Sequence, residues 1–396
     1  MRVLAFFLGF ALILQTTDNS TPSPRQLRAV LESIATAITT QYYDPKVAAS
    51  WRQNQKLYES RILGAKTKQE AVNQIRAALA DLHSSHVFFY TGDEWALRRN
   101  VLPLTFEKRD GRVFVRTALA PAALSFGDEI AEIDGQSSAT LEHKSLAKLS
   151  DVYGNPLYGQ PSSVARLKVV SNGKVREEQV RRIRMDDQDP IQTKALGSNV
   201  FFIRLQSLPG DATGIVHLQM TWKQATTAAA IVMDLRDCGG GWPAASSYLL
   251  DSLLGNSRKP FEALDRNGAE VAPPKTSFAP PPRFAGPVAV LIGEDTQSEC
   301  ELLAAGLKET HRAVLIGEPT AGAFNGFDRT VPLPDDFAFF ALPYTRTVSP
   351  ANVSYEGLGV APDNRVTNSV ADFRSGHDRV LAEAESLVQS GSSIVP

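Results

Sequence analysis

The residues best suited to do chemistry lie in one short polar segment, Thr296-Gln297-Ser298-Glu299-Cys300-Glu301. It joins an apolar strand pattern at residues 287–292 to a helix pattern. A serine between a strand end and a helix start exposes its hydroxyl, and the first N–H groups of a helix lack internal acceptors. Such a turn can hold a nucleophile beside donors for an oxyanion. The alternative is that Thr296 or Ser298 is only a helix N-cap, followed by glutamates that the helix dipole favours.

A second polar turn ends another apolar strand pattern upstream and is rich in glycine: Asp234-Leu235-Arg236-Asp237-Cys238-Gly239-Gly240-Gly241. Consecutive glycines let a backbone approach another group closely and adopt dihedral angles closed to other residues. Two polar turns at strand ends favour the nucleophile interpretation of Ser298 over the N-cap one. Asp234 and Arg236 are expected to form a structural ion pair rather than a catalytic one.

The chain has two cysteines, Cys238 in the glycine-rich turn and Cys300 in the serine turn. So low a cysteine content excludes a scaffold held together by several disulfides. If the two turns meet in space, Cys238 and Cys300 can bridge, which an oxidising compartment permits. The alternative is two buried free thiols that pack as small apolar side chains.

Length and composition indicate a globular protein without a nucleic-acid partner. The 396 residues, 43% of them hydrophobic, are enough for two or three domains with cores. The net charge is −2, and no long block of like charge occurs. Met1-Arg2 and the apolar run at residues 3–14 predict a signal peptide over residues 1–17, and hence an exported protein, periplasmic or secreted. The run is too short to span a bilayer, so no stable membrane insertion is expected after leader removal.

The remaining chain divides into three parts by the pattern of its elements. Helical spacing predicts an N-terminal helical segment over residues 25–98, with helices at 25–41, 46–63 and 68–82. Short strands and turns predict a β-rich module over residues 101–185. Strands and helices alternate over residues 196–390, which predicts an α/β core with a C-terminal helix.

Four motifs of the core follow one another in the order found in one protease family. They are the glycine turn at residues 230–241, the serine turn at 296–301, the strand and turn at 313–320, and a closing segment at 356–363. In these motifs the chain resembles the carboxy-terminal processing (tail-specific) proteases, a family that includes the tricorn protease core. The β-rich module, with Phe126-Gly127-Asp128-Glu129-Ile130, resembles a PDZ module. The resemblance implies a ClpP/crotonase-like α/β core with an inserted PDZ-like module, and a serine endopeptidase acting on peptides or unfolded protein segments.

One departure from the family pattern bears on mechanism. The processing branch pairs its serine with a lysine shortly after the turn at residues 317–320, where this chain has Ala321-Gly322-Ala323-Phe324. The chain matches instead the tricorn-like branch, with a Ser-His pair in the helical segment and a distant glutamate. The resemblance implies Ser298 as the nucleophile and His86 as the base. It also implies that Ser85 bonds the other imidazole nitrogen and that Glu356 holds Ser85.

The same resemblance assigns the backbone around the serine. The N–H groups of Gly240 and Glu299 are expected to bind the oxyanion, and Gly239 and Gly241 to border the substrate. The PDZ-like module has Val101-Leu102-Pro103-Leu104 where a glycine-rich carboxylate loop is expected. Recognition of a free peptide C-terminus is therefore not implied.

Several alternatives remain open. His83 lies one helical turn from His86 and competes as the base, and either histidine can instead be structural. A non-catalytic binding protein on the same fold, or an acyl hydrolase such as an esterase, fits the same motifs. The histidines lack metal-ligand spacing with the cysteines, so neither zinc nor another cofactor is expected. Neither the oligomeric state nor the preferred substrate sequence is predicted.

Overall fold

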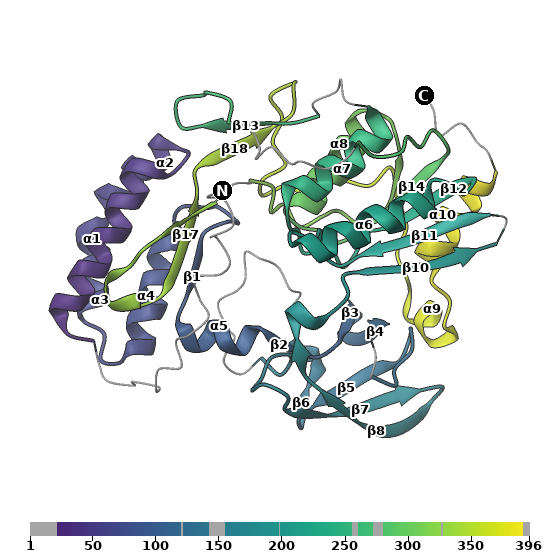
Figure 1. The fold of residues 1–396 in the computed structure, drawn as a ribbon. Coiled ribbons are helices and arrows are strands. Elements are labelled where there is room, and N and C mark those ends of the chain that lie inside the picture. The colour runs from purple at the N-terminus through teal and green to yellow at the C-terminus, as the bar shows by residue number, and fades with distance from the viewer. Residues whose placement is uncertain are drawn as a thin grey trace.

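The computed structural model describes residues 22–119, 122–141, 155–197, 199–255, 260–271, 280–325 and 328–390, so the predicted signal peptide lies outside the described residues. The helices are α1 Pro24–Gln41, α2 Pro45–Gln53, α3 Gln55–Leu63, α4 Lys68–Ala80, α5 Gly92–Arg98, α6 Ala212–Ala225, α7 Pro243–Leu254, α8 Glu299–Glu309, α9 Val370–Ser375 and α10 Arg379–Gln389. The strands are β1 Phe88–Tyr90, β2 Asn100–Val101, β3 Leu104–Arg109, β4 Arg112–Ala118, β5 Glu129–Ile133, β6 Gln136–Ser137, β7 Val164–Ser171, β8 Lys174–Arg181, β9 Ile183–Arg184, β10 Ile191–Leu196, β11 Val200–Leu205, β12 Ala230–Asp234, β13 Glu262–Asp265, β14 Val288–Ile292, β15 Val314–Gly317, β16 Asp328–Val331, β17 Phe339–Pro343, β18 Thr345–Val348 and β19 Asn364–Arg365. Figure 1 shows them in three groups.

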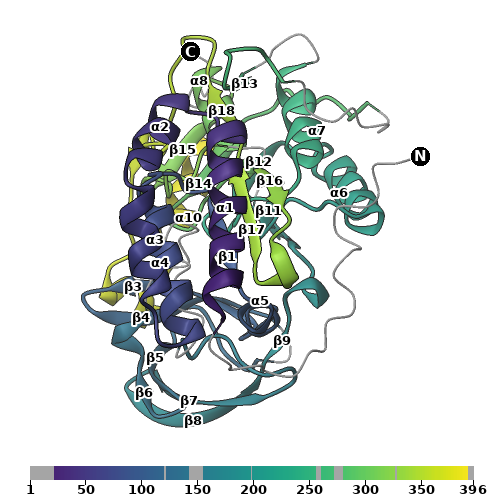
Figure 2. The same ribbon diagram turned by 90° about the vertical axis from the view of Figure 1, so that its left-hand side faces the viewer.

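Helices α1–α4 form the first group and lie beside a small sheet with the strand order β1-β17-β16 (Figure 2). Helix α1 begins where Ser23 caps the first turn and Pro24 occupies the first helical position. Its apolar stripe, which includes Ile34, is buried in one cluster with Phe89 and Phe340 from the sheet. The helices predicted at residues 25–41 and 68–82 are confirmed.

Two features of this part differ from the sequence prediction. The helix predicted at residues 46–63 is two helices, because the chain turns at Asn54, which ends α2 and precedes α3. Residues 25–98 are not helical throughout, since β1 pairs antiparallel with β17 and places Phe89 opposite Phe340. A strand of three residues is too short to show a period of its own, and its partner lies far along the chain.

The second group is an antiparallel sheet with the strand order β3-β4-β5-β7-β8, with β6 beside β5. Asn172 and Gly173, both at positive φ, make the tight turn between β7 and β8. Alternate residues of β7, among them Leu167, are buried in a core that belongs to this sheet. The ring of Phe114 stacks on Phe373 of α9 at 4.7 Å, which joins this module to the last part of the chain.

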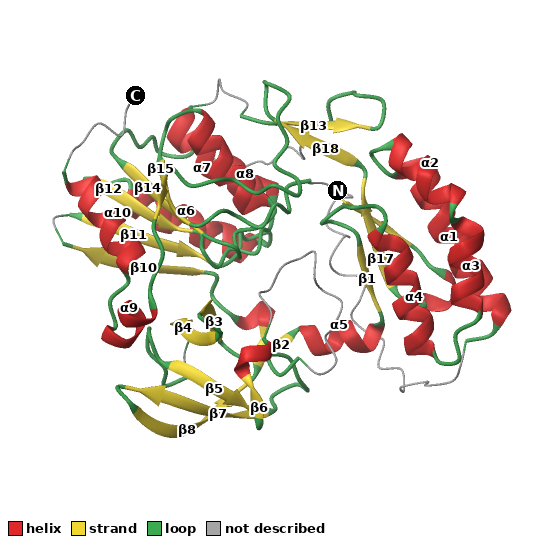
Figure 3. Ribbon diagram, turned by 180° about the vertical axis from the view of Figure 1, so that it is seen from behind, coloured by secondary structure: helices red, strands yellow, loops and turns green. Residues whose placement is uncertain are grey.

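The third group is a six-stranded sheet with the order β10-β11-β12-β14-β15-β19. Strands β11, β12, β14 and β15 are parallel, and β10 runs antiparallel to β11. Helices α6, α7 and α8 pack on one face, where Leu218, Leu249 and Leu303 share a core cluster. Helix α10 covers the other face with Val380 and Ala384 (Figure 3). The prediction of an α/β core is confirmed.

The ends of the central strands determine where the site forms. Strand β12 ends at Asp234 and β14 at Ile292, and the two are parallel neighbours. The glycine turn and the serine turn therefore leave the sheet at the same edge. The predicted C-terminal helix is two helices, α9 and α10, because Gly376 ends α9 in the left-handed conformation.

Candidate active site

Ser298 stands in the turn between β14 and α8, directly before the helix. Its backbone has φ +54° and ψ −128°, a region that residues other than glycine rarely enter. Its N–H donates to the carbonyl of Ala323 at 2.9 Å and to the carboxylate of Glu301 at 3.2 Å, which holds this conformation. The Ser298 hydroxyl lies 2.9 Å from Nε2 of His86.

His86 lies in the turn between α4 and β1 and is 4% exposed. Burial lowers the pKa of His86 below its ordinary value, while the negative charges of Glu356 and Asp328 act in the opposite direction. A neutral imidazole with Nε2 against a hydroxyl can accept the hydroxyl proton. The competing histidine, His83, is exposed and precedes this turn, so His86 is the histidine in contact with Ser298.

The other ring nitrogen of the histidine, Nδ1, lies 2.8 Å from the hydroxyl of Ser85. The backbone N–H of Ser85 donates to one carboxylate oxygen of Glu356 at 2.8 Å. The second oxygen of Glu356 accepts the N–H groups of Phe324 and Asn325 at 2.7 and 2.8 Å. When Nδ1 carries the ring proton, the Nδ1–H group donates a hydrogen bond to the Ser85 oxygen, and Nε2 presents a lone pair to the Ser298 hydroxyl. Glu356 thus holds the turn through its backbone, not through the Ser85 hydroxyl.

Sequence reasoning assigned no role to Glu301 beyond the helix dipole. Its buried carboxylate accepts four hydrogen bonds, from the N–H groups of Ser298, Gly322 and Ala323 and from the hydroxyl of Thr320. These bonds join the serine turn to the loop that follows β15. Burial raises the pKa of Glu301 to about 7, against the effect of its donors. The signal available in the sequence was a glutamate three residues after a helix-capping serine, a spacing that lets the carboxylate reach back to the cap.

Sequence reasoning also assigned no role to Tyr42. Its side chain is fully buried, and its hydroxyl donates to the carbonyl of Leu82 at 2.8 Å. Leu82 lies just before the turn that carries Ser85 and His86, so Tyr42 supports that turn from the side of α1. No local signal identifies this contact, because Tyr42 follows α1 and Leu82 follows α4, 40 residues further along the chain.

The absence of a lysine after β15 has a structural counterpart. The loop at residues 320–325 supplies backbone N–H donors to two carboxylates, as described above, instead of an amine. Lys308 lies in the last turn of α8 and pairs with Asp363 at 2.9 Å. The basic side chain in contact with the Ser298 hydroxyl is therefore the imidazole of His86.

Gly240 lies directly against the serine. A Cβ atom on Gly240 would fall 2.6 Å from the Cβ of Ser298, so a side chain cannot be accommodated there. The φ of Gly240 is +101°, which also favours glycine. Within the described residues, neither the N–H of Gly240 nor that of Glu299 has a hydrogen-bond acceptor. Both groups are free to donate to an oxygen at the serine.

The flanking glycines have different surroundings. A Cβ atom on Gly239 would meet no described atom within 4 Å, so this residue borders open space. Gly241 packs against the backbone of Leu208, where a Cβ would fall 2.1 Å from the Leu208 carbonyl oxygen. The N–H of Gly239 and the carbonyl of Gly240 also bond the segment after β11, to Gln206 at 3.0 Å and to Leu208 at 2.8 Å.

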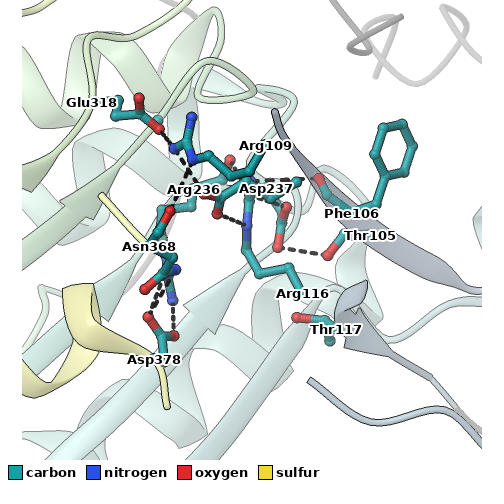
Figure 4. Close-up of polar contacts among 12 residues, drawn as sticks. Thr105, Phe106, Arg109, Arg116, Thr117, Arg236, Asp237, Glu318, Asn368 and Asp378 are labelled. Atoms are coloured by element: carbon teal, nitrogen blue, oxygen red, sulfur yellow. Dashed lines mark hydrogen bonds and ion pairs between the residues drawn. The ribbon is translucent and has the colours of Figure 1, made fainter. Parts of the chain in front are cut away.

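Buried charges anchor the strand end that leads into the glycine turn. The predicted pair of Asp234 with Arg236 is present at 2.8 Å, and Arg204 binds the same carboxylate at 2.7 Å. Burial opposes ionisation of Asp234, but the guanidinium groups of Arg236 and Arg204 hold its pKa well below its usual range. Arg236 also pairs with Asp378 at 2.7 Å, which ties this strand end to α10 (Figure 4).

Asp237 continues the network from the glycine turn to the β module (Figure 4). Its carboxylate forms an ion pair with Arg116 of β4 and accepts the hydroxyl of Thr105 of β3 at 2.8 Å. Arg116 pairs in addition with Glu107, and all three charged side chains are at most 7% exposed. The module is therefore attached to the residue that directly precedes Cys238 in the glycine turn.

Cys238 and Cys300 form a disulfide, with their Cα atoms 6.0 Å apart. That separation is within the usual range for a bridged pair. Both residues are fully buried in the core cluster of α7 and α8. The structure thus selects the bridged alternative over two free thiols, and it joins the glycine turn covalently to the first turn of α8.

Within the described residues, no group of three or more His, Cys, Asp or Glu side chains is arranged to hold a metal ion. None of the described helices combines the length and the apolar character that crossing a membrane requires.

Residues 199–366 match the model of peptidase family S41. Over this segment the chain is similar to peptidase family S41. A carboxyl-terminal-processing peptidase of Arabidopsis thaliana chloroplasts is 27% identical over 259 residues, covering 61% of this chain and 46% of the relative. The carboxyl-terminal-processing protease of Synechocystis is 25% identical over 281 residues, covering 69% of this chain and 63% of the relative.

The fold of this chain is also similar to a solved structure, a photosystem II D1 C-terminal processing protease. The two share 22% sequence identity and a TM-score of 0.56, over 86% of this chain and 93% of the other. The similarity shows that the chain has the mixed α/β fold of S41 peptidases. The chain spans roughly half to two thirds of the length of these two curated relatives.

Proposed function

We propose that this chain is a serine endopeptidase that cleaves peptides or unfolded protein segments. The observation that carries the proposal is the chain of contacts from Ser298 through His86 to Ser85, with distances of 2.9 and 2.8 Å. A hydroxyl, an imidazole and a group that orients the imidazole are the parts that nucleophilic catalysis requires. Their order, with the ring buried and uncharged, is suited to attack on a carbonyl.

In the proposed mechanism, Nε2 of His86 takes the proton of Ser298 as the hydroxyl attacks the scissile carbonyl. The oxygen becomes negative and accepts the N–H groups of Gly240 and Glu299. The imidazolium then returns the proton to the leaving amine, and water releases the acyl group by the same steps in reverse order. Ser85 and Glu356 keep the ring in the orientation that these transfers need.

The β module is proposed to be PDZ-like and to border the substrate path without capturing a free C-terminus. Its segment Val101-Leu102-Pro103-Leu104 is buried, and proline lacks an N–H group. The N–H of Leu102 donates to Leu157, and that of Leu104 to the carbonyl of Leu102. A terminal carboxylate needs free N–H donors, and in this segment Leu102 and Leu104 have theirs engaged while Pro103 has none. This arrangement favours cleavage within a chain.

Export is proposed from the leader pattern and from the disulfide. A buried disulfide beside the nucleophile persists in an oxidising compartment and is rare in a reducing one. Periplasmic or secreted material, after removal of residues 1–17, is therefore the form to test. Intact mass of the mature protein from an exporting host would give the cleavage position.

The first test is labelling of the purified protein by a fluorophosphonate, which reacts with activated serines. Wild type should label at Ser298, and Ser298→Ala and His86→Ala should not. His83→Ala and Lys308→Ala are the matched controls and should label like wild type. Labelling retained in His86→Ala would contradict His86 as the base.

Folded wild type that does not label would favour a non-catalytic binding protein. Assays of the wild type and the same variants on a peptide and on the matching ester then distinguish peptidase activity from esterase activity. Hydrolysis of the ester alone would favour an esterase, because the nucleophile and the oxyanion donors do not select the leaving group.

A further inference from the structure

The one covalent link between the two turns joins the neighbours of the two proposed oxyanion donors. Cys238 stands two residues before Gly240, and Cys300 directly follows Glu299. We infer that the Cys238–Cys300 disulfide is a positioning device for the oxyanion site, so that the oxidised chain is the catalytically competent form. This inference rests on the proposed function and adds a role for two residues that do not touch the substrate.

The contacts around the bridge place it next to the reacting atoms. The Sγ of Cys300 lies 3.7 Å from the carbonyl oxygen of Gly240. The carbonyl of Cys238 accepts the N–H of Gln297, the residue before the nucleophile, at 2.9 Å. The backbone of Gly240 approaches Ser298 so closely that no Cβ fits between them. A shift of the Cys238 segment relative to α8 therefore moves an oxyanion donor relative to the nucleophile.

The glycine turn needs such a restraint because of its composition. Three consecutive glycines have more backbone freedom than any other tripeptide, and two of them adopt positive φ here. The upstream end is restrained at Asp237 by the β module (Figure 4). The downstream end is restrained by backbone bonds to the segment around Leu208. Neither restraint involves α8. The disulfide, in contrast, links the glycine turn to α8, whose first residue, Glu299, supplies the second proposed oxyanion donor.

The hydrogen bond from Gln297 and the bond from the Thr296 hydroxyl to the carbonyl of Leu235, 2.7 Å, also connect the two turns. Both hydrogen bonds lie between the end of β14 and Ser298, on the side of the serine turn that faces the sheet. The disulfide acts on the other side, at the first turn of α8. Without it, the helix start can move while the sheet side stays in place, so we expect the reduced protein to stay folded and to lose rate.

Reduction of the Cys238–Cys300 disulfide balances in electrons and protons. A dithiol such as dithiothreitol supplies two electrons and two protons, the S–S bond breaks, and Cys238 and Cys300 become thiols. The dithiol closes to its own cyclic disulfide. Nothing in the proposed acyl transfer consumes or produces electrons, so the bridge affects rate through geometry alone.

The test compares wild type with the double variant Cys238→Ala/Cys300→Ala. Alkylation of unfolded wild type with and without prior reduction, followed by intact mass, first establishes that the bridge is present. The kcat of the variant on a peptide substrate should fall about 10- to 100-fold, the order of loss for a misplaced catalytic group, with KM within twofold. The acid limb of its pH profile should stay where wild type has it, because the imidazole is not altered.

Two inhibitors distinguish a displacement of the oxyanion donors from a general loss of rigidity in the active site. A peptide aldehyde forms a hemiacetal with Ser298 whose oxygen needs the donors, and the matching peptide alcohol binds without one. The double variant should bind the aldehyde at least tenfold more weakly and the alcohol as wild type does. Equal weakening of both ligands, or an unchanged kcat with a lower melting temperature, would overturn the inference and leave a structural bridge only.

Two further results keep the inference testable. If the alanine variant does not fold, Cys238→Val/Cys300→Ala refills the buried space with apolar atoms and is assayed in its place. Wild type in which both thiols alkylate without reductant overturns the inference. Wild type that does not label with the fluorophosphonate contradicts the proposed function instead, so the two failures are distinguishable.

Discussion

The carboxylate of Glu356 accepts the backbone N–H of Ser85 at 2.8 Å, across 271 residues of sequence. Ser85 precedes His86, so this one bond fixes the turn on which the imidazole stands. The hydroxyl of Ser85 remains available for Nδ1 of the ring. Glu356 is also one of the negative charges that favour the protonated imidazole. It therefore influences both the position and the pKa of the proposed base.

Glu356→Gln should change both properties in a defined direction. Burial lowers the pKa of His86 and the Glu356 charge opposes this, so removing that charge should lower the pKa further. Activity requires the neutral ring, and the acid limb of kcat/KM against pH should therefore move to lower pH. The kcat should fall by up to about 100-fold, because an amide oxygen cannot hold all three N–H groups. Glu32→Gln, an exposed carboxylate on α1, is the control, and an acid limb shifted upward in Glu356→Gln would contradict the assignment.

Ser85→Ala should lower kcat while leaving the fold intact. The substitution removes the partner of Nδ1 but keeps the backbone N–H that Glu356 binds. We expect a loss of about tenfold, smaller than that of His86→Ala, because ring orientation is impaired and the base is retained. Ser84→Ala, at the neighbouring position, is the matched control for kinetics and circular dichroism. Equal losses in both serine variants would exclude a specific role for the Ser85 hydroxyl.

Glu301→Gln should slow acylation of Ser298 without removing the imidazole contact. An amide keeps the size of the side chain, but its NH2 group cannot accept the N–H donors that one carboxylate oxygen now binds. The rate of fluorophosphonate labelling should fall by about tenfold or more. Glu309→Gln, at the other end of α8 and paired with Tyr355, should label at the wild-type rate. A Glu301→Gln variant as fast as wild type would show that the loop after β15 needs no such link.

The side-chain carboxyl group of Glu299 should make the free energy of unfolding depend on pH. Its carboxyl is buried beside the hydroxyl of Ser246, and burial raises its pKa from 4.5 to about 7. The folded state therefore binds this proton more tightly than the unfolded state, and stability is lost as pH rises from about 4.5 to 7. A shift of this size corresponds to about 3 kcal/mol.

The measurement for Glu299 is the free energy of unfolding of wild type and Glu299→Gln at pH 5 and pH 8. The variant, which cannot ionise there, should gain stability relative to wild type at pH 8. Any contribution of Glu301 is present in both proteins and cancels in the comparison. A difference between the two proteins that does not change with pH would contradict the raised pKa.

Arg116→Met should destabilise the attachment of the β module to the core. The substitution leaves the buried carboxylates of Asp237 and Glu107 without their shared cation. Removal of one partner from a buried ion pair costs about 3–5 kcal/mol, measurable by urea denaturation. Lys168→Ala, in the exposed pair with Glu132 of the same module, should leave stability unchanged. A loss in Lys168→Ala as large as in Arg116→Met would mean that burial does not decide the effect.

The local patterns of the sequence predicted the parts that need only neighbouring residues. The apolar runs that became β12 and β14 and the helix start at Glu299 follow from short-range periodicity and capping chemistry. The glycine turn after Asp234 follows from residues that accept unusual dihedral angles. The order of these motifs, with its family resemblance, suggested Ser298, His86, Ser85 and Glu356 as partners.

Tertiary structure alone decided which groups touch. His83 and His86 have the same chemistry and lie three residues apart between α4 and β1, and the packing of these elements against the core brings His86 to Ser298. The roles of Glu301 and Tyr42 depend on loops and helices distant in the chain. The Cys238–Cys300 bridge was one of two alternatives until the parallel pairing of β12 with β14 brought their ends to one edge. Periodicity reports the face that a residue occupies, whereas contacts between distant residues depend on the packing of whole elements.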